Sequence, residues 1–220
     1  MEGLQLPICA IFFSLMLSIV YFSKKRIDLI ENKIYSVMLV CGIIDSILVT
    51  ILQGIALNGV TTTEYIFINL LNKVDFVFIL TFCNCLFLYT GLITIPKMKE
   101  NANKLFKVFN IIGIVVSTII FCCDIELITR GTQSSVSGSA TVLTYIVAAI
   151  YIIGSILIVL FNHKNTDRRH IPIYSIIVIC IFLCIFFNIN PYLIVISITL
   201  TFMNFLLSYS CKAVTANSST

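Results

Sequence analysis

The sequence predicts an all-α protein: a polytopic bundle of seven transmembrane helices with its N-terminus outside the cell and its C-terminus in the cytoplasm. Three observations lead to this prediction. The 220 residues are 59% hydrophobic and only 11% charged, with a mean hydropathy of +1.07, whereas soluble domains are about one-quarter charged. Several segments approach or exceed the roughly 20 apolar residues that cross a hydrocarbon core of about 30 Å. Basic residues are concentrated in alternate loops between these segments, a pattern typical of cytoplasmic loops.

The apolar segments follow one another along the whole chain. They cover residues 6–22, 34–57, 65–95, 105–123, 141–161, 171–187 and 192–210. The first segment has no basic residue before it and no small-residue cleavage site, so we expect a retained helix rather than a signal peptide. Pro7 is expected to open this helix, and Pro96 to follow the third one. Because most of the loops are short, we expect one antiparallel bundle over residues 1–211 and a cytoplasmic tail over 212–220.

The distribution of positive charge sets the predicted orientation. Of the 14 basic residues, all but Lys73 and Arg130 lie after the first, third, fifth or last segment: Lys24, Lys25, Arg26, Lys33, Lys97, Lys99, Lys104, Lys107, Lys164, Arg168, Arg169 and Lys212. Basic residues resist translocation, so these stretches are predicted to be cytoplasmic. The charge therefore reflects topology, and no nucleic-acid partner is expected.

Catalytic and metal-binding motifs are absent from the sequence. The nine cysteines lie in or at the edges of apolar segments, where cysteine behaves as a small apolar residue. No nucleotide-binding loop, nucleophile elbow or zinc-protease motif is present. We therefore predict no enzyme activity, no cofactor and no metal site. The long external stretch "CDIELITRGTQSSVSGSA" is predicted to be a solvated loop.

Four ionisable or amide residues inside the second and third segments are the candidate functional site. An ionisable group at mid-membrane depth costs about 2.5 to 3.5 kcal/mol on insertion scales, so it is a functional candidate by default. Asp45 lies in the second segment, and Asn72, Lys73 and Asp75 lie in the third. We expect a buried Asp45–Lys73 pair, with Asn72 and Asp75 completing an intramembrane polar site that opens outward. The alternative is interfacial: if the third helix projects beyond the bilayer, Lys73 reaches the outer headgroups and Asp75 is solvated.

Four stretches resemble the N-terminal membrane region of bacterial sensor histidine kinases. They are "FSKKRIDLIENKIYSVML" (22–39), "TYIVAAIYIIGSIL" (144–157), "RRHIPIYSIIVI" (168–179) and "NINPYLIVISITLTFMNFLL" (188–207). The loop "ENKIYS" and the turn "NINP" are the most specific parts. The resemblance implies a sensor module in a bacterial cell membrane, working as a homodimer. A small ligand, a peptide or a bilayer property would shift the last helix, which Asn190 and Pro191 open. Since the chain has no phosphoacceptor or ATP-binding motif, it is not expected to phosphorylate anything by itself.

Two other functions remain open. The chain is alternatively a small transporter or channel that uses Asp45 and the polar face of the third helix, in which case Asp45→Asn abolishes flux. It is otherwise an accessory membrane protein that regulates a cytoplasmic kinase partner, in which case it co-purifies with that partner. The sensor reading predicts homodimers without flux.

Overall fold

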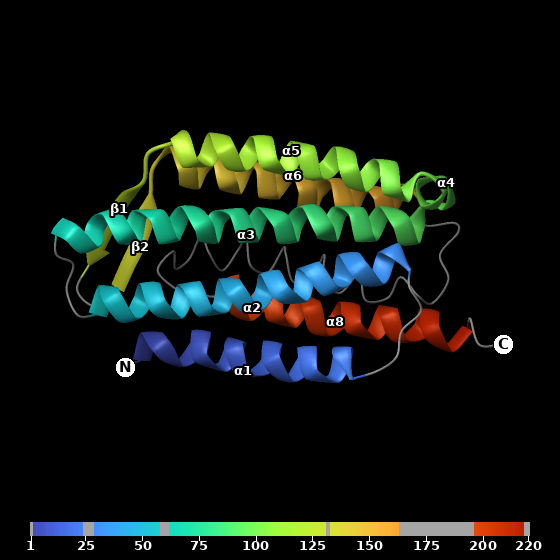
Figure 1. Cartoon of the computed structure of the whole chain (residues 1–220), viewed down its shortest axis with the longest axis horizontal. Coiled ribbons are helices and arrows are strands. Elements are labelled where there is room, and N and C mark those ends of the chain that lie inside the picture. Colours follow the sequence, from blue (N-terminus) through green and yellow to red (C-terminus); the bar gives the residue numbers. More distant parts are fainter. Residues whose placement is uncertain (1, 24–28, 58–61, 131–132, 163–195, 218–220) are drawn as a thin grey trace.

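The computed structural model describes residues 2–23, 29–57, 62–130, 133–162 and 196–217. This part of the chain is almost entirely helical, which agrees with the predicted class (Figure 1). Its helices are α1 (Glu2–Phe22), α2 (Ile30–Leu57), α3 (Thr62–Thr94), α4 (Pro96–Glu100), α5 (Ala102–Cys122), α6 (Ser139–Phe161) and α8 (Ile196–Asn217). The predicted sixth helix, 171–187, and the turn residues Asn190 and Pro191 lie outside the described residues.

Four of these helices are long and apolar enough to cross a membrane: α2, α3, α5 and α6. α1 and α8 contain shorter apolar stretches, Pro7–Phe22 and Thr199–Ser208. Large apolar side chains such as Phe12, Ile114 and Ile150 are exposed on the outside of the bundle. A lipid-facing surface has this character, because acyl chains solvate apolar side chains at no cost.

The observed helices begin at positions that differ from the predicted ones by two to four residues, and this changes the place of one proline relative to its helix. α1 begins at Glu2, so Pro7 lies inside the helix instead of opening it. Proline lacks the N–H that would bond to the carbonyl four residues earlier, a loss that is smallest near a helix start. Pro96 does follow α3, but it also opens the short helix α4, which was not predicted.

The predicted solvated loop between α5 and α6 is wrong in its central part, because it contains a β-hairpin. Strand β1 (Glu126–Arg130) pairs antiparallel with β2 (Gln133–Ser137) in the register Leu127↔Val136. Backbone pairing satisfies N–H and C=O groups that an irregular loop would leave to solvent. At Gly138 (φ 115°) a Cβ atom would lie 2.7 Å from the Asp124 carbonyl oxygen, so the turn into α6 requires glycine.

The helices are arranged around a central pair, α2 and α3 (Figure 1). α1 and α8 pack on α2, whereas α5 and α6 pack on α3. The start of α1 and the end of α8 lie at opposite ends of the bundle, and the hairpin lies at the same end as the start of α1. Any group at the α2–α3 contact is therefore enclosed from both sides.

Tyrosines hold the opposite end of the bundle together. The ring centroids of Tyr21 and Tyr35 are 4.7 Å apart, and those of Tyr35 and Tyr89 are 6.4 Å apart. Tyr35 is fully buried, and its hydroxyl donates a hydrogen bond to the Asn204 carbonyl oxygen of α8 at 2.8 Å. The Asn204 side chain in turn donates to the Met38 carbonyl oxygen of α2 at 3.3 Å. These two bonds tie α8 directly to α2.

This contact between α2 and α8 depends on Gly42, where a Cβ atom would lie 2.8 Å from Asn204 Nδ2. We expect Gly42→Ala to displace that amide, break its bond to Met38 and lower stability by about 1 kcal/mol. Gly54 on the same helix is the control, since nothing lies within 4 Å of a Cβ atom there. Gly54→Ala should leave stability unchanged or raise it by helix propensity. Thermal unfolding of the purified variants measures the difference, and equal melting temperatures would refute the close approach.

Candidate functional site

The predicted site residues lie on the two central helices. Asp45 comes from α2, and Asn72 and Asp75 come from α3; they are 0%, 5% and 6% exposed. Asp45 is ten residues from Ile55 and Asp75 is ten residues from Tyr65, the ends of their apolar spans on the hairpin side. At about 1.5 Å per residue, both carboxyl groups lie roughly 15 Å deep, near the middle of a hydrocarbon core of about 30 Å. Asp75 is therefore not an interfacial, solvated residue.

The structure brings Asp45 and Asp75 together across the α2–α3 contact, close enough for each carboxyl group to act on the other's charge. Within the described part of the chain, neither forms an ion pair, and Asp45 Oδ1, Asp45 Oδ2 and Asp75 Oδ1 are buried without a hydrogen-bond partner. Like charges at short range in a medium of low dielectric repel strongly. The two groups therefore cannot both stay ionised without a counter-charge.

A third side chain, Ser197 of α8, reaches the same place. Its hydroxyl lies beside Asp45, is fully buried, and has no partner within standard hydrogen-bond geometry. On the other side, Tyr145 of α6, which is 40% exposed, is close enough for the charge of Asp75 to act on its hydroxyl. We define the carboxyl site as Asp45, Asp75, Ser197 and Tyr145. Four helices thus contribute to it.

The expected Asp45–Lys73 pair is not formed in this structure. Lys73 Nζ donates a hydrogen bond at 2.9 Å to the carbonyl oxygen of Phe121, in the last turn of α5. Helical geometry explains the difference, because residues 73 and 75 lie about 200° apart around α3. When Asp75 faces α2, Lys73 must face away from it. The flexible lysine stem then carries its ammonium group toward the end of α5.

A Lys73 substitution tests this arrangement. We expect Lys73→Met to change stability by less than about 1 kcal/mol, because only one exposed hydrogen bond is lost. Asp45→Asn should not rescue any loss, since the two residues do not interact. Denaturant titration of the wild type, both single variants and the double variant gives the coupling energy. A coupling above about 1 kcal/mol would show that Lys73 neutralises Asp45 after all.

Most polar groups near the site are satisfied within their own helices. Asn72 Nδ2 donates to the Ile68 carbonyl oxygen at 2.9 Å, and Ser46 Oγ donates to the Gly42 carbonyl oxygen at 2.8 Å. Such bonds to the preceding turn let amides and hydroxyls remain in a membrane helix at little cost. Asn72 therefore supports α3 beside the carboxyl site. Some neutral groups, such as the hydroxyls of Thr94 and Thr141, are also buried without a partner among the described residues, but only the two acids can carry a charge.

Sequence reasoning missed Ser197 and Tyr145. Tyr145 stands near the start of an apolar segment, where tyrosines commonly lie at headgroup depth, and Ser197 stands in an apolar run without any distinguishing neighbour. A hydroxyl inside an apolar helix carries only a weak signal, because it can bond to its own backbone. Only the packing of α8 and α6 reveals what these hydroxyls face.

α8 is joined to its neighbours by side-chain bonds on the same face as Ser197. Ser14 of α1 and Thr201 of α8 share a hydrogen bond of 2.8 Å between their hydroxyl oxygens. Two turns after Ser197, Asn204 of α8 is bonded to α2. Its carbonyl oxygen accepts from the Tyr35 hydroxyl, and its side-chain amide donates to the Met38 carbonyl oxygen. The face of α8 that meets the carboxyl site at Ser197 is therefore the same face that is hydrogen-bonded to α1 and α2.

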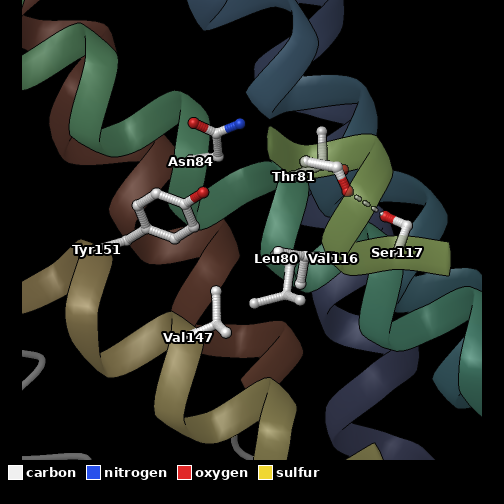
Figure 2. Close-up of a pocket in the computed structure, with 8 residues that line it drawn as sticks. Leu80, Thr81, Asn84, Val116, Ser117, Val147 and Tyr151 are labelled. Carbon is white, nitrogen blue, oxygen red and sulfur yellow. Dashed lines mark hydrogen bonds between the residues drawn. The ribbon is translucent and has the colours of Figure 1, made fainter. Parts of the chain in front are cut away.

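A small cavity lies between α3, α5 and α6 (Figure 2). Its volume is about 20 Å³, enough for one water molecule and far below the several hundred Å³ of a ligand pocket. Asn84 and Tyr151 both project toward it, and Asn84 Oδ1 is buried without a partner while Nδ2 donates to Phe109 O at 3.2 Å. The only dashed bond in the view joins Ser117 Oγ to Gly113 O at 2.8 Å. This cavity fits a buried water.

Among the described residues, no group of three or more histidine, cysteine, aspartate or glutamate side chains could hold a metal ion. The comparisons with known proteins give no further assignment: no protein-family profile matches the sequence, and no curated protein is found as a relative. The carboxyl site has to be interpreted from its own chemistry.

Proposed function

We propose that this protein is a multi-pass signal-input module of a bacterial cell membrane, in which the occupancy of the carboxyl site controls how α8 packs. The contact of Ser197 with Asp45 carries this proposal. This contact places the first turn of α8 beside the two buried carboxyl groups, whose charges repel each other. The remainder of α8 then extends to the opposite end of the bundle, where the C-terminus lies (Figure 1).

The expected mechanism is a change between two packings. A stimulus that alters the charge at Asp45 and Asp75 changes the free energy of every contact that depends on it. Ser197 is one such contact, and the hydrogen bonds to Thr201 and Asn204 lie on the following turns of the same helix. Small shifts at a site can be amplified when a packed helix has two discrete arrangements.

The proposal includes the orientation of the bundle in the membrane and its assembly as a homodimer. The positive loops put the α4 end of the bundle in the cytoplasm, with the hairpin outside, and the chain spans the bilayer seven times as a homodimer. Lys99 of α4 bonds to Glu31 of α2 at 2.9 Å and stabilises this cytoplasmic end. The stimulus is a small molecule, a peptide or a property of the bilayer, and the receiver is a cytoplasmic kinase.

A fusion protein tests the sensor function. The chain is joined after α8 to the dimerising helix and catalytic core of a histidine kinase, in a series of junctions that differ by one residue. In membrane vesicles we expect at least one junction to be active and its autophosphorylation rate to change several-fold on Ser197→Ala. Asp124→Asn, an exposed carboxyl group beside the hairpin, is the matched control and should have no effect. Active fusions that are all insensitive to Ser197 would refute the proposal.

A transporter is the second candidate, and the Asp45–Asp75 pair is the observation that favours it. Paired carboxyl groups inside membrane helices commonly mark ion pathways. Purified protein in proteoliposomes loaded with a pH-sensitive or sodium-sensitive dye should then show flux that Asp45→Asn abolishes. Absence of flux in the wild type, together with a responsive kinase fusion, would leave the sensor as the function.

A further inference from the structure

The described residues supply no positive charge to the carboxyl site. Asp45 and Asp75 lie close together at mid-membrane depth, where an isolated charge is costly. Lys73, the base expected to pair with Asp45, is bound to α5. Buried charges in proteins are paired or coordinate an ion.

Among the described residues, no other side chain around Asp45 and Asp75 supplies a positive charge. The described side chains of α8 contain no acid or base, and the buried polar side chains of α1 are Ser14 and Ser18. The titratable neighbours are Cys41 on α2 and Tyr145 on α6, together with Lys73 on the far side of α3. Neither the thiol nor the phenol can supply positive charge.

We propose that Asp45 and Asp75 form a binding site for one monovalent cation, which is either a proton shared between the two carboxyl groups or a sodium ion held by their oxygens. The proton enters from solvent and resides on one carboxyl group, which donates to the other as O–H···O⁻. This proposal rests on the carboxyl site of the function proposed above and names what occupies it, and it applies equally to a sensor and to a transporter.

The unpartnered hydroxyl of Ser197 supports this assignment independently of the two acids. It is fully buried, comes from a different helix and lies beside Asp45, although no bond between the two meets standard hydrogen-bond geometry. A hydroxyl can donate to the negative charge that remains after one proton is bound, or offer its oxygen to a sodium ion. An all-oxygen set of this kind suits a hard cation. A divalent ion would need more acidic ligands than the described residues bring together.

The pair differs from a structural pair of satisfied polar groups. Many hydroxyls in the bundle bond to their own helix backbone, as at Thr144 and Ser155. Thr94 and Thr141 do not, but a neutral hydroxyl needs no counter-charge. Two buried acids without a base among the described residues need a bound cation to neutralise them.

Thermal unfolding of the purified protein in nanodiscs is the first test. The chain has no tryptophan, so unfolding is followed with a thiol-reactive dye that reports exposure of buried cysteines such as Cys41, Cys83 and Cys85. Carboxyl groups of the unfolded chain ionise at about pH 4, so from there up to the pH at which the folded pair loses its proton, the wild type should lose about 3 °C in melting temperature per pH unit. The double variant Asp45→Asn/Asp75→Asn should abolish this dependence, because amides need no counter-charge, whereas each single variant keeps one buried acid and should only change it. Asp124→Asn should behave like the wild type.

The same experiment separates the two cations. Sodium chloride that restores the melting temperature at alkaline pH, when potassium and choline chloride do not, identifies sodium. A loss that no salt reverses identifies the proton. The infrared band of a protonated carboxyl group, shifted in ²H₂O and missing in the double asparagine variant, gives a second readout. This band is measured on the wild type even where a variant does not fold.

The proposal is overturned if the wild type has no carboxylic acid band at neutral pH and its melting temperature responds to neither pH nor sodium more than that of the double variant Asp45→Asn/Asp75→Asn. That result says nothing about the kinase fusion, where the response to Ser197→Ala is read separately. Conversely, a fusion without response leaves the cation titration unaffected.

Discussion

Asn72→Asp is expected to destabilise the protein by about 3 kcal/mol at neutral pH, the cost of a charge at mid-membrane depth. Asn72 is buried three residues before Asp75 on α3 and donates its amide to the Ile68 carbonyl oxygen. An ionised aspartate cannot donate this bond, and it would add a third negative charge beside the carboxyl site. Denaturant titration of the two proteins in the same detergent measures the difference, which should shrink as the pH is lowered.

Asn162→Asp is the matched control for this change. Asn162 makes the same bond to the carbonyl four residues earlier, at 2.9 Å from Ile158 O, but it lies at the partly exposed end of α6. Its substitution should cost less than about 1 kcal/mol, mainly through the unfavourable helix dipole. Equal losses in the two variants would mean that Asn72 is not in a region of low dielectric, and the depth assigned to the carboxyl site would be wrong.

Tyr35→Ala is expected to have a comparable or larger effect, about 3 to 5 kcal/mol, because it removes a fully buried ring between Tyr21 and Tyr89. It also removes the hydroxyl that holds α8 through the Asn204 carbonyl. Tyr35→Phe keeps the ring and should lose only about 1 kcal/mol for the hydrogen bond. Chemical unfolding of both variants separates the ring from the hydroxyl.

Tyr65→Ala is the control for a tyrosine of the same bonding type. Its hydroxyl donates to the Ile125 carbonyl oxygen at 3.2 Å, but the ring is 39% exposed at the hairpin end. Its loss should cost less than half as much. In the kinase fusion, Tyr35→Phe should change output while Tyr65→Phe should not, since only Tyr35 joins α2 to α8. If Tyr65→Phe changed the output and Tyr35→Phe did not, the signal would reach the kinase through the hairpin end of the bundle and not through the contact between α2 and α8.

The identity of the helices follows from composition alone, and their mutual arrangement does not. Long apolar runs have one stable backbone form in a bilayer, because every N–H and C=O must be satisfied within the segment. That is why the predicted second to fifth helices agree with α2, α3, α5 and α6 to within four residues. The hairpin escaped prediction because "ELITR" and "QSSVS" are short, and strand pairing is a property of two segments.

The candidate site shows the same division. Asp45, Asn72 and Asp75 could be identified from sequence, because a polar residue in an apolar run stands out against the cost of burying it. The residue that Asp45 meets across the α2–α3 contact could not be predicted from sequence. Lys73 and Asp75 are two residues apart, so they face opposite sides of α3, and a small difference in the rotation of that helix decides which one meets α2.

The sequence by itself determined a helical protein with membrane-compatible spans and located its buried acids, because hydrophobicity and helix length depend on neighbouring residues only. The tertiary structure decided that two acids meet each other instead of an acid meeting a base, that Ser197 of α8 completes their surroundings, and that Lys73 bonds to α5. These outcomes depend on the rotation and packing of helices that are 30 to 150 residues apart in the chain. No local pattern encodes that rotation, because it results from the sum of all side-chain contacts around α2 and α3.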